Sequence, residues 1–162
     1  MEWLHSQQVS LVLKPLVALL LTLPFAYERE QSTNIMGLRT YPLVSLGACS
    51  YVMIGLLTFP ADSADAMART LQGILSGLGF IGGGAIIKNA EGVRGTASAA
   101  TIWVTGSVGA AVGFGCYALA LVVSLLSLTI LKVLKSFKFG LGPESGATDV
   151  FDASAKEESS SS

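Results

Sequence analysis

The sequence predicts an all-α membrane protein, a compact bundle of about five transmembrane helices with almost no soluble domain. Hydrophobic residues make up 51% of its 162 residues and charged residues only 13%, about half the charged share of a typical soluble domain. The charges gather between long apolar runs and leave the runs nearly bare. Each run is close to the roughly 20 residues that a helix needs to cross the hydrocarbon core.

Five apolar runs account for the predicted spans. The first contains Lys14 near one end, where its ammonium can reach the lipid headgroups. The fourth is the least hydrophobic, being mostly Ala, Gly, Ser and Thr, and the fifth is the most apolar. The spans are predicted at residues 9–27, 41–59, 67–87, 97–114 and 117–135. Together they form a predicted transmembrane domain over residues 1–138.

The distribution of basic residues predicts the orientation of this bundle, because short cytoplasmic loops are enriched in Lys and Arg. With five spans, Lys14 and Arg69 lie on one side. The other side collects eight of the ten basic residues: Arg29, Arg39, Lys88, Arg94, Lys132, Lys135, Lys138 and Lys156. We therefore expect the N-terminus outside and the C-terminus in the cytoplasm.

The remaining composition limits the partners and covalent links. Residues 139–162 are rich in Ser, Asp, Glu and Gly, and with so little apolar surface they are predicted to form a disordered acidic tail. The net charge of −1 leaves no basic face for nucleic acid. Cys49 lies near the middle of one run and Cys116 near the end of another, so two free thiols are expected.

A glycine-rich stretch in the third predicted span is the most distinctive motif. Glycines four residues apart form faces along which helix backbones approach closely in lipid. One interpretation is a packing seam between the third and fourth helices. The other is a broken helix whose freed backbone groups line a site for an ion or substrate, with residues 82–84 as the place of the break. The glycines concerned are Gly73, Gly77, Gly79, Gly82, Gly83 and Gly84.

Charged residues from three spans converge on the predicted cytoplasmic face. Buried pairs among them would be charge-assisted, partly desolvated and costly to break singly. Simple anchoring at the lipid interface is the alternative for any one of them. This inner-face charge cluster consists of Glu28, Arg29, Glu30, Arg39 and Arg94.

The centres of the apolar runs contain no Asp, Glu or His, and the single histidine is His5. A path that dehydrates a divalent cation favours carboxylate ligands, so this pattern weakly disfavours direct magnesium transport and leaves any metal site unknown. Because no nucleophile has an evident neighbouring base, we expect neither an enzyme nor a cofactor.

Four motifs occur in the order and spacing of one bacterial family. They are Glu28-Arg29-Glu30, Gly37-Leu38-Arg39-Thr40, the stretch from Gly77 to Ile86, and Val93-Arg94-Gly95 leading to Ala99-Ala100-Thr101-Ile102-Trp103. With these motifs, residues 16 to 130 resemble the MgtC/SapB family of bacterial membrane proteins. Gly37, Thr40, Gly95, Thr101 and Trp103 are family-motif positions. Thr22 and Ala26 stand where the family usually has glycine.

The resemblance implies a multi-pass protein of the bacterial inner (plasma) membrane, linked to magnesium homeostasis, growth at low magnesium and virulence. The sequence is similar to the short, SapB-like form without a cytoplasmic C-terminal domain. One implied role is a regulator that contacts a membrane partner through its helices, with the F-type ATP synthase as the partner. The alternative is a transporter or channel for Mg²⁺ or another small solute. Glycine-rich faces also predict a homo-oligomer.

Overall fold

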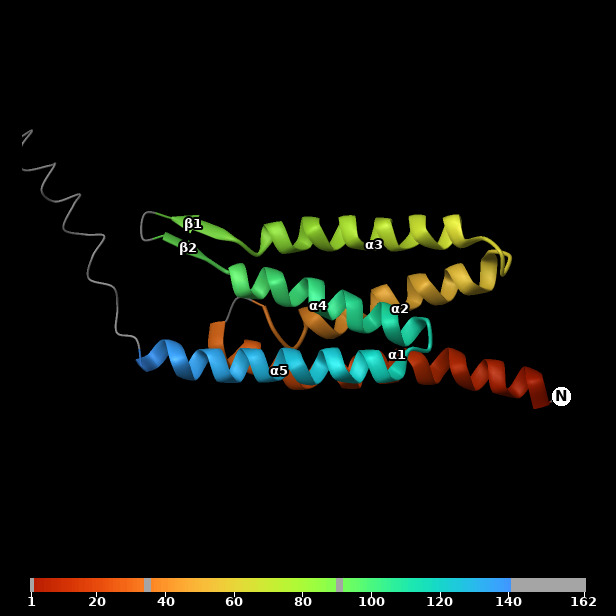
Figure 1. The fold of residues 1–162 in the computed structure, drawn as a ribbon, viewed down its shortest axis with the longest axis horizontal. Coiled ribbons are helices and arrows are strands. Elements are labelled where there is room, and N and C mark those ends of the chain that lie inside the picture. Colours follow the sequence, from red (N-terminus) through yellow and green to blue (C-terminus); the bar gives the residue numbers. More distant parts are fainter. Residues whose placement is uncertain (1, 34–35, 90–91, 141–162) are drawn as a thin grey trace, which may run out of the picture. The chain divides into compact units, whose positions relative to one another are not determined.

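The computed structural model describes residues 2–33, 36–89 and 92–140. Within these ranges the prediction of five helices is confirmed, and a short β-hairpin joins the third helix to the fourth (Figure 1). The predicted tail lies, from residue 141 onward, outside the described residues. The elements are α1 (Glu2–Thr33), α2 (Thr40–Thr58), α3 (Ala64–Gly84), β1 (Ile87–Asn89), β2 (Gly92–Arg94), α4 (Thr96–Gly113) and α5 (Tyr117–Gly140).

The chain divides into two compact units, Met1–Leu131 and Lys132–Ser162, with the boundary inside α5. The first unit contains α1 to α4 and most of α5. Two described segments, Gln8–Ser32 and Thr40–Thr58, are long and apolar enough to cross a membrane, and Tyr117–Val133 is a shorter apolar helix. Membrane crossing by all five helices remains a prediction.

Helix α4 forms the centre of the first unit. Its sequence of small residues allows neighbouring helices to approach its backbone, and most of its length is buried. A Cβ at Gly109 would overlap the carbonyl oxygen of Ser45 in α2, and one at Gly113 would lie 2.9 Å from the carbonyl oxygen of Cys49. Glycine is therefore required on α4 wherever α2 crosses it.

Helix α1 packs against this centre through a stripe with helical spacing. Ala18, Thr22, Phe25, Ala26 and Arg29 are all buried, and their separations of three and four residues place them on one face. The small side chains at 18 and 22 let α2 come close, since Ser45 Oγ donates a 3.2 Å hydrogen bond to the carbonyl oxygen of Ala18.

Helix α3 lies beside α4 (Figure 1) but is far more exposed, with only Leu78 and Gly82 buried. The Leu78 side chain fills the space above Gly106, where a Cβ would overlap it. Gly82 meets Ala99 across the same contact, with 3.5 Å between the position of a Cβ and the Ala99 carbonyl oxygen. These two points hold α3 on α4.

The hairpin between α3 and α4 pairs Ile87 with Arg94 and Lys88 with Val93. Its exit requires Gly95, which has φ +88° and lies so close to Ala85 that a Cβ would overlap the Ala85 carbonyl oxygen. Both the positive φ and the contact exclude other residues. The family-motif position Gly95 therefore fixes where α4 begins relative to the end of α3.

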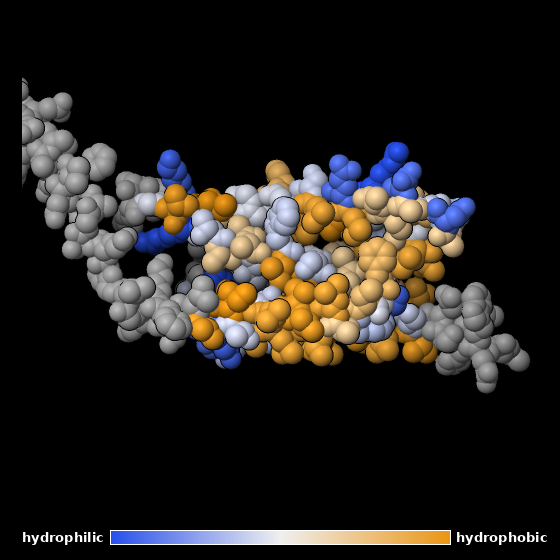
Figure 2. Space-filling model, viewed as in Figure 1, coloured by the Kyte–Doolittle hydropathy of each residue, from blue (hydrophilic) through white to orange (hydrophobic). Residues whose placement is uncertain are grey.

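The end of α4 and the start of α5 are also set by backbone geometry. Gly115 has φ +81°, and the Cys116 N–H donates to the Ala111 carbonyl at 2.8 Å, as in a Schellman motif. Ser124 Oγ of α5 then donates to the Leu21 carbonyl of α1 at 2.6 Å. Other sides of α5 present apolar residues such as Leu119 and Leu125 to the surface, and the lower part of the face in Figure 2 is largely apolar. Both cysteines are free, as predicted.

Candidate functional site

Arg29 is the buried centre of the predicted inner-face charge cluster. Its side chain is only 8% exposed, and its Nη2 donates a 2.7 Å hydrogen bond to Ser98 Oγ in the first turn of α4. Hydrogen bonds to an ionised donor are among the stronger ones in proteins. Arg29 thus ties the end of α1 to the start of α4.

Aromatic residues enclose this contact. The Tyr41 hydroxyl donates to the Ser98 carbonyl oxygen at 3.4 Å, and the Tyr41 ring meets Phe25 edge to face at 6.4 Å between centroids. Both rings are fully buried. Ser98 therefore receives contacts from α1 and α2 at once, so the cation sits where three helices meet.

Glu30 points to another part of the same end of the bundle. Its Oε2 accepts a 3.0 Å hydrogen bond from the backbone N–H of Leu38, and a Cβ at Gly37 would lie 2.7 Å from the Glu30 Cα. Gly37, a family-motif position, is needed because the chain before α2 passes directly over Glu30. This contact fixes the entry into α2.

The other charged residues of the predicted cluster are less buried than Arg29. Glu28 is half-buried, whereas Arg39 at the start of α2 and Arg94 at the end of β2 are exposed. The structure therefore brings Arg29 into the bundle, uses Glu30 to hold a loop, and leaves Arg39 beside a groove. The functional role of the cluster stays a prediction.

The glycines of α3 differ from what either sequence interpretation expects. Helix α3 continues unbroken to Gly84, with Ala85 as its C-cap, so residues 82–84 end the helix and do not interrupt it. Of the predicted seam, Gly82 packs on α4. Leaving aside neighbouring residues of α3 itself, no described atom lies within 4 Å of where a Cβ would stand on the others, which are Gly73, Gly77, Gly79, Gly83 and Gly84.

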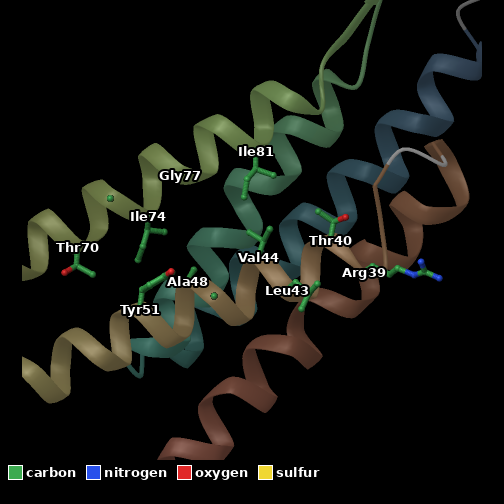
Figure 3. A pocket seen from close by; sticks show the side chains of 12 residues that line it. Arg39, Thr40, Leu43, Val44, Ala48, Tyr51, Thr70, Ile74, Gly77 and Ile81 are labelled. Carbon is green, nitrogen blue, oxygen red and sulfur yellow. The ribbon is translucent and has the colours of Figure 1, made fainter.

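An apolar groove of about 760 Å³ runs between α2 and α3. Val44 and Ala48 line it from α2, and Ile74, Gly77 and Ile81 line it from α3 (Figure 3). Tyr51 and Thr70 stand at one end, and the Arg39 side chain extends outward at the other.

The remaining family-motif positions lie in three different environments. Thr40 is the first residue of α2 and lines the groove. Thr101 is buried in α4, where its hydroxyl donates to the Ala97 carbonyl oxygen at 2.7 Å. Trp103 lies on the exposed strip of α4, with 52% of its side chain accessible. Among the described residues, no group of three or more His, Cys, Asp or Glu side chains is placed to hold a metal ion.

Sequence reasoning missed the contacts that join helices through single polar groups. The sequence predicts that Lys14 reaches the headgroups, but its Nζ donates to the Gly113 carbonyl at 2.9 Å. Gly113 ends α4, and a cation is favourable at the C-terminus of a helix. Neither Ser98 nor Tyr41 is among the site residues that the sequence predicts. The contacts of Arg29 and Tyr41 with Ser98 depend on how three helices cross, which no spacing in the sequence encodes.

These features define a helical bundle with apolar surface, a buried arginine at one end and an apolar groove between α2 and α3. The profile of the MgtC family matches residues 16–139, and the chain belongs to this family. SrpB of Synechococcus elongatus is 33% identical over 132 residues, a match that covers 74% of this chain and 72% of SrpB.

Two further relatives are longer than the matched region. MgtC of Salmonella typhimurium is 34% identical over 117 residues, covering 72% of this chain and 49% of MgtC. YhiD of Escherichia coli, whose name describes a candidate magnesium transporter, is 32% identical over 120 residues, covering 70% of this chain and 55% of YhiD. The chain thus spans about half the length of these two relatives. No solved structure matches it.

Proposed function

We propose that this protein is a multi-pass bacterial inner-membrane protein that regulates a membrane partner through helix contacts, in a role linked to magnesium. The relatives named MgtC and YhiD support the link to magnesium, and the two candidate spans support the membrane location. The observation that carries the regulatory role is the open glycine face of α3 formed by Gly79 and Gly83.

Gly79 and Gly83 are four residues apart and therefore share one side of α3. This side is distinct from the one that holds Leu78 and Gly82 on α4 and from the groove side that carries Gly77. In lipid, where no hydrophobic effect drives helices together, such small-residue faces allow close backbone contact. The face is thus suited to a transmembrane helix of another protein.

The F-type ATP synthase is the proposed partner, on the strength of the family resemblance alone. The test is affinity capture of the full chain from solubilised native membranes, with ATP synthase subunits as the readout. Gly79→Leu and Gly83→Leu should lose these subunits, because a leucine on this face keeps the partner backbone away. Gly73→Leu, on the groove side of the same helix, is the matched control and should retain them.

Equal recovery of ATP synthase by all three variants would show that the glycine face is not the docking surface. Absence of the subunits from the wild-type capture would remove this partner.

The regulatory role is non-enzymatic, and it predicts that a strain lacking the protein grows poorly at low magnesium. A homo-oligomer, also predicted, is checked by the mass of the purified protein in detergent.

Transport of Mg²⁺ is the second candidate function, favoured by the name of YhiD. Purified protein in liposomes with an imposed magnesium gradient and an entrapped indicator measures it directly. Flux that depends on the protein would support transport over regulation. Liposomes that hold the gradient as well as protein-free ones would rule it out.

A further inference from the structure

The groove between α2 and α3 is closed at one end and open at the other. Near the closed end Met67 packs against Gly55, where a Cβ would lie 2.8 Å from the Met67 Sδ. The connection between the helices is also short there, from Phe59 to Ser63. Toward the start of α2 the helices leave space between them, as Figure 3 shows around Val44 and Ile81.

Glycines widen this space from both walls. Gly47 of α2 and Gly77 of α3 line the groove, and within the described part of the chain no atom outside the glycine's own helix stands within 4 Å of a Cβ built on either. Other lining residues such as Ala48 and Ile74 are apolar. In the membrane location proposed above this groove faces lipid, where its apolar lining suits an apolar ligand.

The length of the groove identifies the ligand. It extends along α2 from Arg39 to Tyr51, which at 1.5 Å per residue is about 18 Å. One leaflet of a bilayer contributes about 15 Å of hydrocarbon, half of the roughly 30 Å core. A transmembrane helix of a partner would need a surface along the whole core. The groove matches a single acyl-chain layer.

The charge at the open end identifies the headgroup. Arg39 is exposed there beside Thr40, and none of the described residues that line the groove is acidic. In the orientation that the distribution of Lys and Arg predicts, this end lies at the cytoplasmic headgroups. A guanidinium binds phosphate oxygens through a planar fork of donors.

We propose that the α2–α3 groove binds an anionic phospholipid of the cytoplasmic leaflet. Its acyl chain lies between Val44 and Ile74, over Gly47 and Gly77, and its phosphate contacts Arg39. The proposal rests on the membrane location and orientation proposed above. It does not depend on the partner face at Gly79 and Gly83, which is on another side of α3.

Native mass spectrometry of the full chain in detergent tests this proposal, with phosphatidylglycerol and phosphatidylethanolamine added in turn. Wild-type protein should retain phosphatidylglycerol more strongly. Arg39→Gln should weaken phosphatidylglycerol binding about fivefold, since one basic residue near an anionic lipid contributes about 1 kcal/mol, and should leave phosphatidylethanolamine unchanged. Arg69→Gln is the matched control, because it changes an exposed arginine near the start of α3, away from the open end of the groove. Equal retention of the two lipids by wild type, or equal loss in both variants, would overturn the proposal.

A second pair of variants tests the acyl-chain part. Gly77→Leu places a side chain into open space in the groove, so the protein should fold and lose both lipids, whereas Gly83→Leu should keep them.

Excess glycerol phosphate should not displace the lipid, because the headgroup alone lacks the apolar contacts. Displacement by glycerol phosphate would reduce the site to a phosphate site. Unchanged lipid retention in Gly77→Leu with a loss of dimers would show that a second copy fills the groove. Either of these results would overturn the lipid proposal. Neither would change the outcome expected for the capture experiment with Gly79→Leu, which tests another side of α3.

Discussion

Helices α3 and α4 are both rich in glycine, yet the structure uses their glycines in opposite ways. In α4, Gly106, Gly109 and Gly113 are each covered by an atom of a neighbouring helix. In α3, Gly82 alone among the seam glycines has such a neighbour. Glycine in α4 makes room for helices of the same chain. At its other positions, glycine in α3 leaves room that the described part of the chain does not fill.

The difference extends to polar groups. Helix α4 is tied to its surroundings by Arg29 on Ser98 and by Lys14 on the Gly113 carbonyl. On α3, the Thr70 hydroxyl donates to the Ala66 carbonyl of its own helix. A small-residue pattern therefore indicates close helix contact without telling whether the contact lies inside the protein or with another molecule.

Replacement of Arg29, the arginine that anchors α4, should reduce the stability of the protein most. Arg29→Met is expected to lower the free energy of unfolding by about 2–3 kcal/mol, because it removes a buried hydrogen bond to a charged donor. Arg69→Met, at an exposed position on α3, should have little effect. Thermal unfolding of both variants in detergent measures this, and equal midpoints would contradict the role of α4 as the tied centre.

In the connection between α3 and α4, replacing Gly95 should reduce the free energy of unfolding more than replacing Gly92. Gly95→Ala combines a strained positive φ with overlap on the Ala85 carbonyl, so a loss of about 2 kcal/mol is expected. Gly92→Ala also has positive φ but meets nothing within 4 Å, and its loss should be smaller. The same unfolding measurement ranks the two, and the reverse ranking would show that the contact with Ala85 does not fix α4.

The smallest loss of stability is expected for removal of the hydroxyl of Ser45, the α2 residue opposite Gly109. Ser45→Ala removes the hydrogen bond from α2 to the Ala18 carbonyl, at an expected loss of about 0.6 kcal/mol, the average for bonds between membrane helices. Thr70→Ala removes a bond within α3 only and should change less. Unfolding in detergent by added SDS resolves differences of this size when both variants are measured beside the wild type. A larger loss for Thr70→Ala would contradict the comparison.

The five helices could be predicted because runs of about 20 apolar residues are local features of the sequence. The hairpin at Ile87–Arg94 was not predicted, since three-residue strands give no periodic signal. Arg29 was predicted as part of a charged cluster, but its partner Ser98 could not be, because 69 residues separate them. The fate of each glycine depends on which helix crosses it, and that is a property of the packing.

The matched pair Gly109→Ala and Gly77→Ala tests the central comparison most directly. Both add one methyl group to a helical glycine. At Gly109 the methyl overlaps the backbone of Ser45, so we expect a loss of about 1–3 kcal/mol of unfolding free energy. At Gly77 it enters open space, so the better helix propensity of alanine should leave stability unchanged or raise it by up to about 1 kcal/mol. A loss at Gly77 equal to that at Gly109 would show that α3 is packed as tightly as α4 and would contradict this account.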